Sequence, residues 1–96
     1  MVARTSTWRG SPEELDKWEA HVAARVSGFV AGLPGNAGGA FFIDREAGRA
    51  LTLTLWETEE AAAETDKFAE QSRASTVEAT GVELVERGGY AVVMQF

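Results

Sequence analysis

The stretch Ala50–Asp66, ALTLTLWETEEAAAETD, decides the fold of this 96-residue chain. Its first half alternates, with a leucine at every second position of Leu51–Leu55 and with Ala, Thr and Trp56 on the opposite face. This alternation predicts a strand. After Trp56 the sequence changes to glutamates and alanines, which predicts a helix with Thr58 as its N-cap.

The two faces of this strand need different surroundings. The leucine face can pack on helices, whereas the face of alanine and threonines also needs a cover for the indole of Trp56. We expect a second copy of the same chain to be that cover.

The residues before this stretch predict a strand and then a helix. Val2–Trp8 alternates like a strand, and its polarity leaves its inward face open. Ser11 begins the helix as N-cap, with Pro12 at the first helical position and Glu14 placed to close a capping box. We expect the helix to run to about Ala31. Its apolar stripe toward the sheet consists of Leu15, Val22, Val26, Phe29 and Leu33, with Trp18 and Val30 on the margins.

The remaining residues predict a hairpin, a second helix and a last strand. Residues 36–39 are expected to be a flexible connection, Ala40–Arg45 a strand with apolar residues on both faces, and residues 44–49 a turn. The second helix is expected over Glu59–Ser72, followed by a loose helical turn over residues 73–80. Val82–Phe96 alternates like a strand, and the glycine pair at 88 and 89 suggests a bulge or bend.

The order strand, helix, strand, strand, helix, strand is the split βαβ arrangement of ferredoxin-like α+β folds with an antiparallel sheet. Residues 1–96 are expected to form one such domain, with both helices on one face. The open face then includes Trp56 or the leucines, and Phe41 or Phe42, which is too much apolar surface for a monomer. Two such faces together exceed the roughly 1,000 Å² of a real interface. We therefore expect a homodimer that forms an α/β barrel.

Composition disfavours several classes of function. A formal net charge of -6, without a basic run, opposes binding to nucleic acid. No apolar run approaches the roughly 20 residues of a membrane span, and the N-terminus lacks the apolar centre of a signal peptide, so we expect a cytoplasmic protein that binds no membrane. The chain has no cysteine and one histidine, so neither thiolate sites nor multi-histidine metal sites are expected.

The stretch Leu53–Ala61, LTLWETEEA, and the order of elements over nearly the whole chain resemble the antibiotic biosynthesis monooxygenase superfamily of small dimeric α/β-barrel proteins. In that family a third strand ending in Trp leads into the second helix. Members range from cofactor-free oxygenases of aromatic polyketides to heme-degrading enzymes and to proteins without a known reaction. The resemblance implies the fold and the dimer, and it does not select the activity.

Two departures from the family pattern bear on which activity the chain can have. Heme-degrading members carry an Asn on the first strand and a Trp and a His on the second helix, whereas this chain has Thr5–Thr7 in that strand and neither Trp nor His between 57 and 80. Heme degradation is therefore disfavoured. The cofactor-free oxygenases tend to use an Asn and a Trp near the pocket, but the only Asn here, Asn36, lies in a Gly-rich loop. The mechanism of the cofactor-free oxygenases therefore cannot be applied directly to this chain.

His21 is the candidate general base, because imidazole is the side chain that exchanges protons most readily near neutral pH. It lies beside the apolar stripe, on a flank with Glu14, Trp18 and Arg25. In one interpretation this flank is a pocket wall, where His21 deprotonates a phenolic or enolic substrate, Arg25 stabilises the anion and Trp18 lines the cavity. In the other it is a solvated helix edge whose charged residues interact at helical spacing.

Aromatic residues are the candidates for substrate binding. Trp56, at a strand end, can stack on a planar substrate, and Phe42, Phe68 and Tyr90 can line an apolar pocket. For each of them, core packing or a dimer contact is the alternative. Glu19, close to the apolar stripe, faces either a cavity mouth or solvent.

These features lead to two hypotheses. The first is a cofactor-independent monooxygenase that acts on a small aromatic or quinone-like molecule with O₂, without a bound cofactor or metal. In this hypothesis His21 generates a substrate anion that reacts with O₂ in a cavity that excludes water. The alternative is a non-catalytic dimer of the same fold that binds a small apolar ligand or serves in assembly. The sequence identifies neither the substrate nor which sheet face carries the pocket.

Overall fold

Four strands form one antiparallel sheet in the computed structural model, which describes residues 1–96. The strand order is β2-β3-β1-β4, so the first and third strands lie at the centre. This order, together with the alternation of strands and helices, confirms the predicted ferredoxin-like α+β fold. The strands are β1 (Val2–Arg9), β2 (Asn36–Asp44), β3 (Arg49–Trp56) and β4 (Glu83–Ala91).

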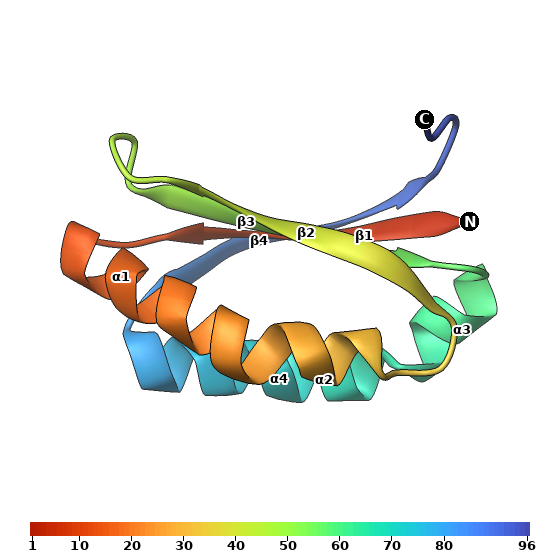
Figure 1. Ribbon diagram of the computed structural model, residues 1–96, viewed down its shortest axis with the longest axis horizontal. Helices are drawn as coiled ribbons and strands as arrows, with labels where there is room; N and C mark the ends of the chain where they lie inside the picture. The colour runs from red at the N-terminus through yellow and green to blue at the C-terminus, as the bar shows by residue number, and fades with distance from the viewer.

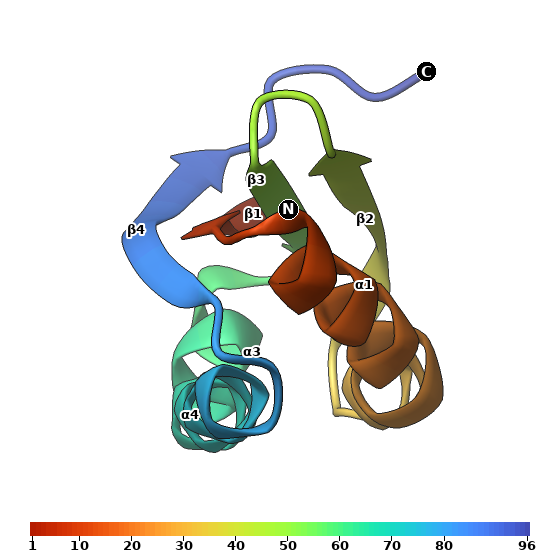
Figure 2. The same ribbon diagram turned by 90° about the vertical axis from the view of Figure 1, so that its left-hand side faces the viewer.

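Two helical segments cover one face of the sheet and leave the other face bare (Figure 1 and Figure 2). The first runs from α1 through a π-helical turn, η1, into α2, and the second consists of α3 and α4. None of these helices has both the length and the apolar character that crossing a membrane requires. Their bounds are α1 (Pro12–His21), η1 (Val22–Val26), α2 (Ser27–Ala31), α3 (Glu59–Glu64) and α4 (Asp66–Thr80).

Both predicted helix starts are confirmed by their hydrogen bonds. The Ser11 hydroxyl accepts from the backbone N–H of Glu14 at 3.2 Å, and the Glu14 carboxylate accepts from the Ser11 N–H at 2.9 Å, which closes the capping box. At α3 the Thr58 hydroxyl accepts from the N–H of Ala61 at 3.0 Å. The chain therefore passes from β3 into α3 where the sequence predicts.

The helices cover the face of β3 that carries Trp56, and the leucine face stays open. Trp56 is 1% exposed, and it pairs with Val2 on the covered face of the sheet. Its indole N–H donates to the Thr54 hydroxyl at 3.0 Å. In the same way, Trp8 donates to the Thr52 hydroxyl at 3.3 Å. The expectation that a second copy of the chain covers Trp56 is therefore wrong, since the helices of the same chain cover it. The leucines do not pack on these helices, because the threonines of the other face supply the acceptors that two buried indoles need.

The π-helical turn decides which residues of the first helix reach the core. The N–H of Ser27 donates to the carbonyl of Val22, five residues earlier, as in a π-helix. Because this turn takes up an extra residue, Val30 continues the buried side and Phe29 is 46% exposed. The predicted inward position of Phe29 is wrong, since it assumed an unbroken 3.6-residue period. The buried apolar core is Trp8, Leu15, Trp18, Val22, Val26, Val30, Ala50, Trp56, Ala62 and Val82.

Three boundaries also differ from the prediction. Residues 36–39, expected to be a flexible connection, are paired with β3 as the start of β2. Residues 73–80 are regular helix within α4, where the hydroxyls of Thr76 and Thr80 donate to helix carbonyls one turn earlier at 2.8 and 2.6 Å. β4 ends at Ala91, so residues 92–96 continue beyond the strand. Its register irregularity lies opposite Thr7 and Trp8, not at the glycine pair.

Candidate active site between the sheet and the helices

A small cavity lies between the covered face of the sheet and the helices. Its volume is about 60 Å³, whereas one water molecule occupies about 30 Å³ in the liquid. Most of its wall is apolar and comes from both layers. The apolar wall includes Trp8, Val22, Val26, Val30, Phe41 and Trp56.

A wider hollow continues from this cavity between β2 and α2. Its volume is about 390 Å³, and it shares Val30, Phe41 and Thr54 with the cavity. Gly38 and Gly39 of β2 form part of its rim, and a Cβ atom placed on Gly38 would meet nothing within 4 Å. Ligand sites commonly measure about 300–1,000 Å³, so the hollow has the size of a ligand site and the cavity forms its inner end.

The threonine hydroxyls and the indole N–H groups of the cavity are hydrogen-bonded within the protein. The hydroxyls of Thr52 and Thr54 accept from the two indole N–H groups. The hydroxyl of Thr76 donates to the carbonyl of Ser72 at 2.8 Å. These groups therefore stabilise the wall. Arg4 and Arg73 are the cavity residues that have a buried nitrogen atom without a hydrogen-bond partner.

Arg4 of β1 and Arg73 of α4 bring two guanidinium groups to the cavity. Arg4 Nη1 and Arg73 Nη2 lie 3.2 and 3.6 Å from the same Oδ1 atom of Asp66. Neither contact has hydrogen-bond geometry, so both nitrogens are buried without an acceptor. Burial lowers the pKa of Arg73 from its ordinary value, the charge of Arg87 lowers it further, and Asp66 acts in the opposite direction.

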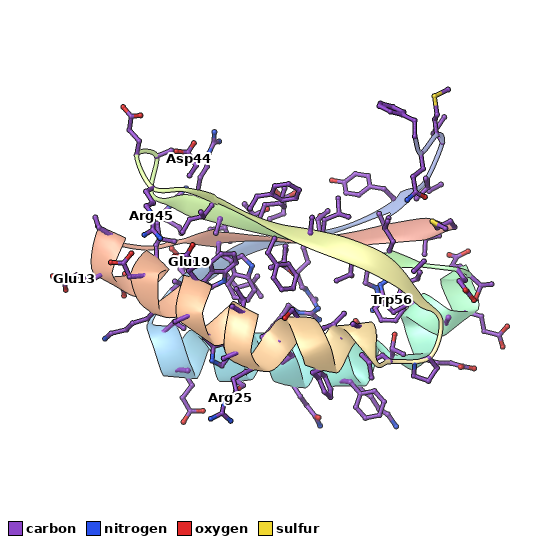
Figure 3. The ribbon with its side chains drawn as sticks, viewed as in Figure 1. Glu13, Glu19, Arg25, Asp44, Arg45 and Trp56 are labelled. Carbon is purple, nitrogen blue, oxygen red and sulfur yellow. The ribbon has the colours of Figure 1, made fainter.

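The predicted site residues do not form one pocket. Trp56 lines the cavity. His21, Arg25 and Phe68 lie around a different hollow of about 560 Å³, which we call the outer groove. Figure 3 shows Arg25 pointing away from the sheet, whereas Trp56 lies between the sheet and the helices. The predicted base and the predicted anion-stabilising residue thus share a surface outside the cavity.

Val26 and Ser72 border both hollows. Val26 belongs to η1 and Ser72 to α4, and each lines both the cavity and the outer groove. His21 lines the outer groove and not the cavity, so its imidazole is not part of the cavity wall. The roles predicted for His21 and Arg25 stay predictions that require a substrate in the outer groove.

The other predicted residues lie in the core or on the open face. Trp18 is 2% exposed and packs in the core without lining the cavity. Phe42 and Tyr90 are 50% and 61% exposed on the open face of the sheet. Glu19 faces solvent, where its Oε2 contacts Arg45 Nη2 at 2.5 Å beside the turn between β2 and β3 (Figure 3).

Arg4 and Arg73 are the residues that the sequence interpretation missed. Arg4 alternates with Ser6 and Trp8 on one face of β1, so a charged residue on the same face as a Trp was an available signal. Arg73 gave no such signal, because its segment was expected to be a loose turn. In the regular helix α4 it lies one turn after Ala69, which also lines the cavity.

The residues around the cavity do not fit a heme. The cavity lining contains no His, Cys, Met or Tyr that would serve as an axial ligand. The single histidine lies at the outer groove. No group of three or more His, Cys, Asp or Glu side chains is arranged as a metal site.

Several solved structures have the same fold. A Deinococcus radiodurans protein, provisionally assigned as an antibiotic biosynthesis monooxygenase, aligns with a TM-score of 0.79 and 14% identity, over 100% of this chain and 96% of that chain. SnoaB, a cofactor-independent oxygenase from Streptomyces nogalater, aligns with a TM-score of 0.65 and 18% identity, over 98% and 94%. MhuD, a heme-degrader from Mycobacterium tuberculosis solved with two hemes in its active site, aligns with a TM-score of 0.69 and 20% identity, over 100% and 99%. The predicted resemblance is therefore confirmed at the level of the fold.

Sequence comparison gives a shorter match. No family model matches the chain. Two uncharacterized proteins of Mycobacterium tuberculosis, from strains CDC 1551 and H37Rv, are each 36% identical to it over 61 residues. This segment is 64% of the chain and 27% of each relative, so the match spans only a part of those longer proteins.

Proposed function

We propose that this chain, which has the fold of the antibiotic biosynthesis monooxygenases, is a cofactor-independent monooxygenase for a small aromatic or quinone-like molecule. The observation that carries the proposal is the apolar cavity with two buried indoles at the inner end of a hollow of ligand size. The fold supports it, because the cofactor-independent oxygenase SnoaB has the same fold. A non-catalytic ligand-binding or assembly protein of this fold is the alternative.

The proposed reaction needs no external reductant. A C–H group of the substrate loses a proton and leaves an electron-rich carbanion, which adds O₂ to form a C–O bond and a peroxide anion. The peroxide takes up a proton, and water is then lost together with the second hydrogen of that carbon, which becomes a carbonyl. One oxygen atom of O₂ ends in the product and the other in water. The apolar wall favours these steps because it excludes bulk water from the anion.

The position of His21 bears on where this reaction takes place. His21 and Arg25 line the outer groove, whereas the cavity lies between the sheet and the helices and is lined mostly by apolar side chains. We place the reacting carbon in the cavity, because its apolar wall shields a carbanion from water better than the outer groove does. The cavity lining contains no imidazole or carboxylate, so the cavity wall itself supplies no general base for this proton.

We also propose that two copies of the chain pair through their open faces and form an α/β barrel. Phe42 and Tyr90 are half exposed or more on this face, beside the leucines of Leu51–Leu55. The C-terminal segment rises on the same side of the sheet (Figure 1 and Figure 2), and its Phe96 is fully exposed. A surface of this kind is typical of an interface, and a stable dimer buries roughly 1,200–2,000 Å² in total.

Oxygen uptake with a panel of anthrones and quinols tests the proposed reaction. Two alanines of α4 give a matched pair of variants, because Ala69 lines the cavity and Ala79 lines the outer groove. We expect Ala69→Leu to fill the cavity and abolish uptake, and Ala79→Leu to retain it, with thermal unfolding confirming that both variants fold. The reverse result moves the reaction to the outer groove. If the wild-type chain consumes no oxygen with any compound, the non-catalytic alternative is the better description.

A further inference from the structure

Arg4 and Arg73 share one oxygen of Asp66 as their ion-pair partner, and their hydrogen bonding within the protein is incomplete. Their side chains are 22% and 14% exposed, and one Nη atom of each is buried without an acceptor. A buried donor without a partner is unfavourable, and an acceptor brought by a ligand removes this cost. Both residues line the cavity, so a ligand bound there lies beside their side chains.

Positive charge exceeds negative charge around these two side chains. A single carboxylate, that of Asp66, contacts both guanidinium groups, and it does so through one oxygen atom. The charge of Arg87 also acts on Arg73. The Asp66 side chain is 47% exposed, so water screens its charge more than it screens the charges of the arginines. The site therefore has a net attraction for an anion.

We propose that Arg4 and Arg73 bind an ionised oxygen of the aromatic ligand, which belongs to a carboxylate or to an acidic hydroxyl group that has lost its proton. This inference rests on the proposed function, because it specifies the class of molecule that the same cavity takes. A guanidinium group presents a planar fork of N–H donors, which matches the oxygens of such an anion. Trp8 and Trp56 line the same cavity and provide apolar contact for the ring.

The arrangement also explains how a cavity without a base supports the reaction. An ionised hydroxyl group conjugated with the reacting carbon makes that carbon electron-rich. Arg4 and Arg73 favour this ionised form by placing positive charge beside it in a poorly hydrated site. The two arginines then hold the substrate in its reactive form, and no imidazole is needed at the cavity.

Matched ligand pairs test the inference without any oxygen chemistry. The first pair is 4-nitrobenzoate and 4-nitrobenzamide, and the second is 4-nitrophenol and 4-nitroanisole at mildly alkaline pH, where the phenol is ionised. Isothermal titration calorimetry on the full chain gives the affinities. Charge-assisted hydrogen bonds are expected to make an anion bind about tenfold more tightly than its neutral partner. A preference in the first pair identifies a carboxylate, and a preference in the second identifies an ionised hydroxyl group.

Variants then assign the preference to the two arginines. Arg4→Gln and Arg73→Gln are each expected to remove most of it while the neutral partner binds as before. Asp66→Asn acts in the opposite direction and strengthens anion binding, because it removes the group that competes for both guanidinium groups. A misfolded variant would not gain affinity, so this second result does not depend on the stability of the arginine variants. Arg49→Gln is the matched control, since Arg49 pairs with Asp44 at 3.3 Å on the surface.

The outcomes separate this inference from the proposed function. Equal affinity within both pairs, no measurable binding of either anion, or an unchanged preference in both arginine variants overturns the inference. A preference that depends on Arg4 and Arg73, without oxygen uptake by any compound, retains the inference and overturns the oxygenase. Oxygen uptake at wild-type rates in both arginine variants retains the oxygenase and overturns the inference.

Discussion

Arg4 and Arg73 come from opposite layers of the molecule and meet at one oxygen of Asp66, at 3.2 and 3.6 Å. Arg4 belongs to the central strand β1, whereas Arg73 and Asp66 both belong to α4. The carboxylate therefore links the helix layer to the sheet. Its negative charge also offsets the repulsion between the two guanidinium groups.

Loss of this carboxylate is expected to destabilise the protein. Asp66→Asn should lower the free energy of unfolding, because two guanidinium groups lose their counter-charge. The expected loss is only about 1–2 kcal/mol, because the ion pairs of Asp66 with Arg4 and Arg73 are partly exposed. Urea unfolding at a fixed protein concentration measures the change. The double variant Asp66→Asn with Arg73→Gln should recover part of the loss, and a purely additive result would show that the two side chains do not interact.

Pairing through the open face makes a different prediction. Leu53→Glu places a charge at the centre of that face, where Leu53 pairs with Thr5 of β1 and Ala40 of β2. We expect the wild-type chain to sediment as a dimer at micromolar concentration and the variant as a monomer, because a buried unpaired carboxylate is unfavourable. Val77→Glu is the control, since Val77 is 37% exposed on α4 and should leave the dimer intact. A stable wild-type monomer would exclude the barrel.

Replacement of His21 distinguishes the two hollows. If the reaction takes place in the cavity, His21→Ala should change the rate of oxygen uptake by less than about twofold, because His21 lines the outer groove. Loss of a true general base would instead lower the rate by about 10²–10⁴-fold. The measurement is the oxygen uptake of the variant with a substrate confirmed for the wild-type chain. A loss of the larger size would confirm the role predicted for His21 from the sequence and place the substrate in the outer groove.

Heme binding is also open to a direct test. Because the cavity lining lacks an axial ligand, titration of hemin should produce no saturable shift of the Soret band. His21→Ala serves as the comparison, since His21 is the only histidine. A saturable shift that disappears in this variant would show that the outer groove holds heme and that the cavity is not the only ligand site.

Local signals gave the most reliable predictions. The capping box at Ser11, the N-cap at Thr58 and the passage from β3 into α3 each depend on a few adjacent residues, and all are present. The inward face of β3 was not predictable in this way, because it depends on hydrogen bonds between its threonines and two indoles. Periodicity also failed beyond Val26, since nothing in the sequence marked the π-helical turn that exposes Phe29.

The candidate site was less accessible to sequence reasoning than the fold. Trp56 was predicted to contact a ligand and does line the cavity, but its partners come from distant segments. The meeting of Arg4 with Arg73 depends on how the sheet and α4 are placed, which no spacing along the chain reveals. His21 and Arg25 carry suitable chemistry on one helix flank, yet that flank faces the outer groove.

The cavity and the outer groove approach each other within the helix layer. Val26 and Ser72 are the two side chains that border both hollows, one from each helical segment. A gas molecule needs far less room than an aromatic ring, so a smaller residue at either position would open a path for dioxygen that bypasses the rim formed by β2. In the proposed reaction, the entry of dioxygen could therefore be changed at the helices without changing β2, which lines the hollow proposed for the aromatic molecule.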